Sequence, residues 1–79
     1  MLISYLDAAM AHAKYELLED GTYYGEIEEC PGVWANEAHL EACRTELLSV
    51  LEDWVLVRIS DHLFLPVIDG LELKVGSAA

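Results

Sequence analysis

The sequence predicts an α+β fold in which a small, antiparallel-rich sheet of three or four strands packs on one long helix, in the order α-β-β-β-α-β. Apolar residues recur at three- and four-residue steps near the N-terminus and again from Leu40, which is typical of amphipathic helices. Asp20-Gly21 separates two β-prone runs, and apolar and charged residues alternate over a final strand at 71–75. We expect a single domain spanning residues 1–79.

The first 28 residues predict a helix followed by a β-hairpin. The apolar spacing places the helix at residues 2–13, and the hairpin follows at 14–28. Asp-Gly is a frequent two-residue type I′ turn, since both of its residues tolerate positive φ. Alternation in the second strand favours Tyr23, Gly25 and Ile27 on the core side. A longer loop would shift the strand pairing by one residue and exchange the faces.

A turn, a short strand and a long helix are predicted next. Cys30-Pro31-Gly32 has turn chemistry, and a third strand follows at 33–35. The long helix covers residues 39–60, with Asn36 as a candidate cap. From Trp54 to Ile59 this helix is apolar on nearly every side, so it must be covered on several sides.

Composition excludes several classes of function. Fifteen acidic residues against four basic ones give a net charge of −11, which opposes direct binding to nucleic acid or to an anionic membrane and favours a basic protein partner. A hydrophobic content of 54% is too high for a disordered chain, and the apolar runs are too short to span a bilayer. Without a basic leader segment or a disulfide pattern, we expect a cytoplasmic protein with reduced thiols.

No catalytic residue, metal site or cofactor is predicted, so we do not expect an enzyme. The three histidines lie on different predicted elements, without the spacing of a metal motif. Cys43 falls on the apolar side of the long helix, and Cys30 stands beside Glu28 and Glu29, whose charges oppose thiolate formation.

Two sets of residues are candidates for interactions. Acidic and aromatic side chains gather around the hairpin, and we expect partner binding by Glu16, Glu26, Glu28, Glu29 and Trp34. Two other interpretations of these acids stay open: ordinary solvent-facing residues, or a metal-dependent nuclease centre. The apolar end of the long helix predicts a homo-oligomer interface at Trp54, Val55 and Ile59.

The stretch Tyr23–Ala35, YYGEIEECPGVWA, followed by LEAC at Leu40–Cys43, resembles the HicB-like antitoxins over about residues 14–68. The resemblance implies a β-β-β-α-β domain with a partial, degenerate RNase H-like fold. It also implies neutralisation of a small, basic, mRNA-cleaving toxin of the HicA type. Two positions depart from the family pattern: Glu28 stands where a proline is usual, and His39 stands where a Thr or Ser cap is usual.

Full antitoxins of this kind append a DNA-binding segment. Few residues follow the predicted last strand, so we expect an N-terminal-type domain without that appendage and without direct nucleic-acid binding. The alternatives are a solitary oligomeric HicB-like protein with a different partner, or a metal-dependent nuclease remnant.

Overall fold

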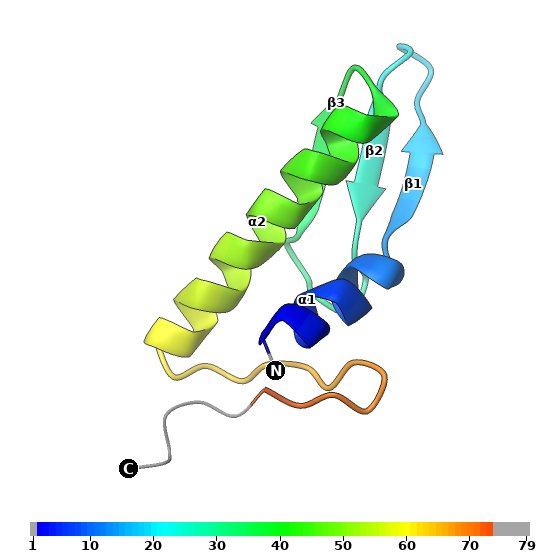
Figure 1. Ribbon diagram of the computed structural model, residues 1–79. Coiled ribbons are helices and arrows are strands. Elements are labelled where there is room, and N and C mark those ends of the chain that lie inside the picture. The colour runs from blue at the N-terminus through cyan, green and yellow to red at the C-terminus, as the bar shows by residue number, and fades with distance from the viewer. Residues whose placement is uncertain (1, 74–79) are drawn as a thin grey trace.

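Two helices and three strands make up the part of the chain that the computed structural model describes, residues 2–73 (Figure 1). The chain forms α1 (Leu2–Ala11), β1 (Lys14–Leu17), β2 (Tyr23–Glu26), β3 (Trp34–Glu37) and α2 (Leu40–Ser60), in that order. The strands form one antiparallel sheet with β2 in the centre. The predicted α+β class is therefore confirmed. Within residues 2–73, neither helix combines the length and the apolar character needed to cross a bilayer.

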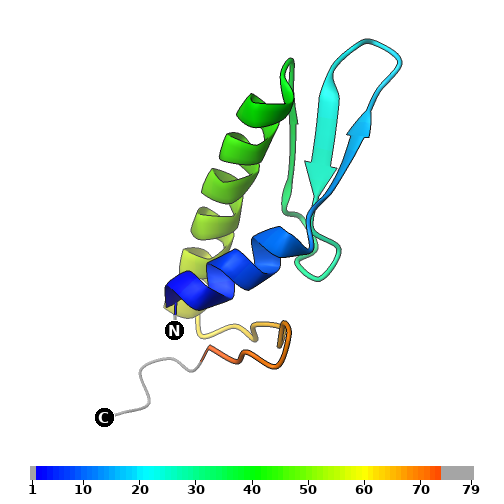
Figure 2. The same cartoon turned by 45° about the vertical axis from the view of Figure 1, so that its right-hand side comes forward.

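Helix α2 lies along one face of the sheet, while α1 crosses the C-terminal half of α2 (Figures 1 and 2). The core forms between α2 and the sheet because Cys43, Leu47, Leu51 and Val55 recur at four-residue steps and form one fully buried stripe. Apolar side chains of the other segments complete this core: Tyr5, Ala9, Ile27, Cys30, Val33, Ala35, Leu65 and Ile68.

The hairpin turn differs from the predicted two-residue turn. The amide of Leu18 donates to the Thr22 carbonyl at 2.8 Å, which leaves a loop of three residues, 19–21. Gly21 has a φ of +86°, whereas the φ of Asp20 is not positive, so the type I′ prediction is wrong. The Asp20 carboxylate instead accepts hydrogen bonds from the amide and the hydroxyl of Thr22, at 2.9 and 2.6 Å. Both bonds hold the pKa of Asp20 below its ordinary value, the hydroxyl bond more strongly.

The longer loop sets the register of the hairpin. Glu16 lies opposite Tyr24, and Tyr15 lies opposite Gly25. The core side of β2 is as predicted, since Gly25 and the adjoining Ile27 are buried and Tyr23 packs against the core. Because opposed residues share a face, Tyr15 joins the core side and Glu16 joins the outer side.

Asn36 does not cap α2. Its side-chain amide donates to the Tyr23 carbonyl and to the Thr22 hydroxyl, both at 2.9 Å. The side chain is therefore bonded to β2 and the residue before it, and not to the start of the helix. His39 is the residue at the helix N-cap, and its side chain makes no capping hydrogen bond. The prediction failed because Asn36 is part of β3 rather than of the loop before the helix.

The predicted final strand is wrong where the structure describes it. Leu71 forms only an isolated bridge with Ile68, across a tight turn at Asp69-Gly70, and residues 72–73 add no strand. Positions 74–75 of that prediction lie outside the described residues. The segment after α2 passes beneath α1 (Figures 1 and 2), where the Tyr5 hydroxyl donates to the Pro66 carbonyl. It therefore packs against the helices instead of extending the sheet.

Candidate functional site

The outer face of the sheet is covered by neither helix (Figure 2). Strand alternation and register place Tyr24 and Glu26 of β2 on this face, together with their partners in the neighbouring strands. One row contains Glu16, Tyr24 and Asn36, and the next contains Lys14, Glu26 and Trp34. We call these six residues the outer sheet surface.

An aromatic pair occupies this surface. The rings of Tyr24 and Trp34 are stacked, with centroids 6.0 Å apart and an interplanar angle of 25°. Trp34 is nevertheless 54% exposed, which is unusual for the largest side chain and typical of a contact surface. The Tyr24 hydroxyl donates to a Glu26 carboxylate oxygen at 3.1 Å, so a negative charge is fixed beside the pair. Partial burial, followed by this hydrogen bond and the charges of Glu26 and Glu16, raises the pKa of Tyr24.

The structure separates the predicted binding acids into two groups. Glu16 and Glu26 lie on the outer sheet surface with Trp34, as one patch. Glu28 follows just beyond the end of β2, where its carboxylate pairs with the Lys14 ammonium at 3.2 Å. Both partners are exposed, so this pair contributes little to stability.

Glu29 makes its contact away from the sheet, with His12. Its carboxylate lies 2.9 Å from Nδ1 of His12, and the carboxylate of Asp69 lies 2.8 Å from Nε2 of the same ring. His12 therefore joins the loop after β2 to the turn at Asp69-Gly70. The hydrogen bond to Asp69 is the main cause that raises the pKa of His12, and the charges of Asp69 and Glu29 add to it. This arrangement assigns Glu29 to a structural contact rather than to the outer sheet surface.

A hollow of about 420 Å³ lies at the free edge of β3, between that strand and α2. Its lining includes Trp34, the carboxylate-bearing residues Glu37 and Glu46, and Val50. Trp34 thus belongs both to the outer sheet surface and to the lining of this edge hollow.

The predicted oligomer interface is only partly at the surface. Val55 is completely buried in the core, so its assignment to an interface is wrong. Trp54 and Ile59 are partly buried against the same core. The neighbouring Leu56 and Val57 are more than half exposed.

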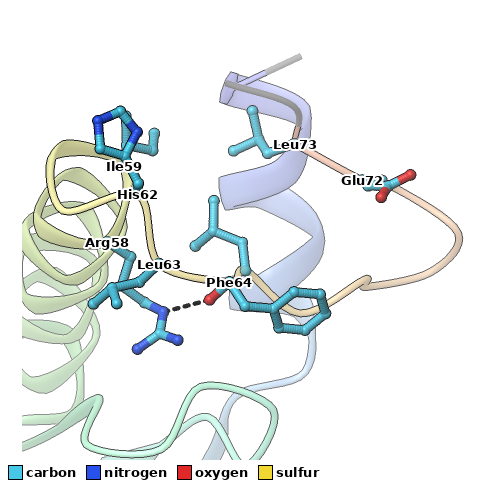
Figure 3. A pocket seen from close by; sticks show the side chains of 8 residues that line it. Arg58, Ile59, His62, Leu63, Phe64, Glu72 and Leu73 are labelled. Atoms are coloured by element: carbon cyan, nitrogen blue, oxygen red, sulfur yellow. Dashed lines mark hydrogen bonds between the residues drawn. The ribbon is translucent and has the colours of Figure 1, made fainter. Parts of the chain in front are cut away.

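A second cavity, of about 250 Å³, lies at the C-terminal end of α2 (Figure 3). Arg58 donates from Nε to the Phe64 carbonyl at 2.6 Å, and its guanidinium lies 4.8 Å from the ring centre of Trp54. Figure 3 shows the side chains of His62 and Arg58 pointing to different sides, and that of Glu72 pointing away from both. These polar groups do not converge on one ligand, so this cavity is the weaker candidate.

Metal-binding and nucleophilic side chains form no site in the part of the chain that the structure describes. Within residues 2–73, no three His, Cys, Asp or Glu side chains are arranged to hold a metal ion. Both cysteines are free and buried. Burial, and then the charge of Glu29, raises the pKa of Cys30 to about 11, which opposes the thiolate form.

Tyr24 was not among the predicted binding residues, although strand alternation places it on the same face as Glu26. The register of β2 and β3 brings both beside Trp34. Glu37 and Glu46 are nine positions apart on different elements, and only the packing of α2 on β3 brings them to one hollow.

Comparison with known proteins identifies relatives of this chain. The family model described as UPF0150-like matches residues 4–66. The crystal structure of TTHA0281 from Thermus thermophilus is similar, with 41% sequence identity and a TM-score of 0.89 over 95% of this chain and 94% of that one. No curated protein matches the chain significantly.

Proposed function

Because the chain belongs to the UPF0150-like family, we propose that it is a non-catalytic protein-binding domain of the HicB-like antitoxin type. Its partner is a small, basic, mRNA-cleaving toxin of the HicA type, which it neutralises by occupying the surface that would otherwise bind RNA. The proposal rests above all on the outer sheet surface, where the exposed Trp34, stacked on the partly buried Tyr24, stands beside Glu16 and Glu26.

The negative charge and the aromatic pair would act at different stages of binding. A ribonuclease must present Lys and Arg to the phosphates of its substrate, so its active surface is positive. The net charge of −11 on this chain attracts such a surface over distance and speeds the encounter. Once contact is made, the aromatic pair supplies the large, rigid side chains that anchor many protein interfaces.

The test is binding to a basic protein encoded beside this gene. We expect the two chains to copurify after coexpression and toxin growth arrest to be relieved. The double variant Glu16→Gln/Glu26→Gln should slow association about tenfold at low salt and make it less salt-dependent. The control is Glu41→Gln/Glu52→Gln, which removes the same charge from exposed positions of α2. Failure to copurify, or equal slowing by both double variants, would contradict docking on the outer sheet surface.

We also propose that the chain forms a homo-oligomer through the exposed apolar side of α2. Leu56 and Val57 are each 55% exposed, and Phe64 beyond the helix end is 75% exposed, which favours burial between copies. Sedimentation of the full chain at micromolar concentration tests this. We expect a mass above 8.8 kDa that falls to this value in Val57→Ser/Phe64→Ser, whereas a monomeric unmodified chain would refute it.

A further inference from the structure

We propose that the edge hollow beside Trp34 binds an arginine side chain of the partner, with the guanidinium lying on the indole and paired with Glu46 or Glu37. This inference rests on the proposed function for the identity of the partner. It adds a specific ligand group and two acids, Glu37 and Glu46, that lie outside the outer sheet surface.

The walls of the hollow suit a guanidinium group. Arginine is planar and weakly hydrated, so it stacks on aromatic faces while its in-plane N–H groups pair with carboxylates. The lining of the hollow contains both kinds of residue, Trp34 and Glu37 from β3 and Glu46 from α2. A lysine ammonium lacks the planar surface and the fork of donors, so it would use only the charge.

The molecule itself contains this type of pair at its other tryptophan. The guanidinium of Arg58 lies 4.8 Å from the ring centre of Trp54, so the positive charge at that ring comes from the same helix. Trp34 has no such neighbour among the described basic residues. Lys14 pairs with Glu28, and Arg44 belongs to the side of α2 that faces Tyr15 of β1.

Position also favours an arginine that comes from a partner. The hollow lies at the free edge of β3 and shares Trp34 and Asn36 with the outer sheet surface, so a protein docked on that surface would lie next to it. Both acids lie on regular elements, β3 for Glu37 and α2 for Glu46, which fixes their backbone positions.

The experiment uses the full chain and two peptides of equal charge. The probes are acetyl-Gly-Arg-Gly-Arg-Gly-amide and its lysine twin, and the signal is the shift of the backbone amide resonances of Glu37 and Val50, which line the hollow, in the labelled protein. We expect the arginine peptide to bind about two- to fivefold more tightly than the lysine peptide. Trp34→Leu should abolish the difference between the peptides while the remaining resonances keep their positions.

A matched pair of variants separates the hollow from overall charge. Glu46→Gln should weaken binding of the arginine peptide about two- to threefold. Glu52 is an exposed acid of the same helix outside the hollow, so Glu52→Gln should change the affinity for this peptide less than about 1.5-fold. Equal binding of the two peptides, or equal effects of the two variants, would overturn the arginine assignment. Neither result would affect the antitoxin proposal, which fails only if the basic partner does not bind.

Discussion

The two faces of the sheet are made from alternate residues of the same strands, yet they differ in side-chain size, charge and burial. The inner face carries Gly25, Ala35 and the adjoining Ile27, all buried under α2. The outer face carries Tyr24, Glu26 and Trp34 and is covered by neither helix.

The inner face accepts only small residues at its centre. A Cβ atom at Gly25 would lie 2.9 Å from Cδ1 of Tyr15 and 3.2 Å from the Cys43 sulfur. Stability is therefore concentrated on this side, where Gly25, Ala35 and Ile27 are enclosed. The outer face has no such constraint at the exposed Trp34, so this side chain is free to serve binding.

The largest expected effect comes from the inner face. Leu47→Ala removes a completely buried side chain of α2 and should lower the free energy of unfolding by about 3–4 kcal/mol. Urea denaturation followed by circular dichroism measures this. Leu40→Ala on the same helix is the control, since Leu40 is exposed and should cost less than about 1 kcal/mol. Equal losses would contradict the placement of the core.

A smaller loss of stability is expected at Gly25, where the inner face is crowded. Gly25→Ala should destabilise the protein by about 1–2 kcal/mol, because the added methyl group contacts the Tyr15 ring and the Cys43 sulfur. The same substitution in a Tyr15→Ala background should cost clearly less, which a double-mutant cycle detects. An unchanged cost in both backgrounds would show that another contact is responsible.

The outer face should tolerate change. Trp34→Leu removes a stacking contact worth about 0.5–1.5 kcal/mol and no core packing, so the free energy of unfolding should fall by no more than about 1.5 kcal/mol. Denaturation of this variant, compared with Leu47→Ala, checks the contrast between the faces. A loss as large as that of Leu47→Ala would mean that the outer face is structural.

The smallest effect concerns the contact outside the sheet that His12 makes with Glu29 and Asp69. Folding raises the pKa of His12, so the native state favours the protonated ring. Its stabilisation is complete below the ordinary pKa of about 6.5 and is lost as the pH rises through the higher native value. The stability difference between the unmodified chain and His12→Gln should therefore be larger at about pH 6 than at about pH 9. The control is the same comparison in an Asp69→Asn background, where His12 lacks its main carboxylate partner and the difference between the two pH values should shrink.

The sequence alone was sufficient for the two helices and the three strands of the sheet, but not for the segment after α2, where it predicted a further strand. Regular apolar spacing located both helices to within two residues of their observed ends, because helix burial repeats with the turn of the backbone. Alternation in β2 identified the side of Gly25 and Ile27 that faces the core. Glu16, Glu26 and Trp34 were selected as candidates from their residue types, and they lie on one face.

Register decided which of the acids lie together, and the hairpin loop sets the register. A two-residue turn would have placed Leu18 opposite Tyr23, but the three-residue loop places Leu17 there and brings Glu16 beside Tyr24. Glu29 could not be separated from Glu28 by sequence reasoning, since its contact with His12 joins positions 17 residues apart.

The two Asp-Gly pairs show where local sequence stops being sufficient. Both residues of Asp69-Gly70 have positive φ, as a type I′ turn requires, whereas Asp20-Gly21 has positive φ only at the glycine. The dipeptide determined that the chain turns at both places. What holds the aspartate differs between the two turns. Asp20 accepts hydrogen bonds from Thr22, two residues further on, which is a local contact that the sequence already contains. Asp69 contacts His12, 57 residues away in the chain, and only the tertiary structure brings these two residues together.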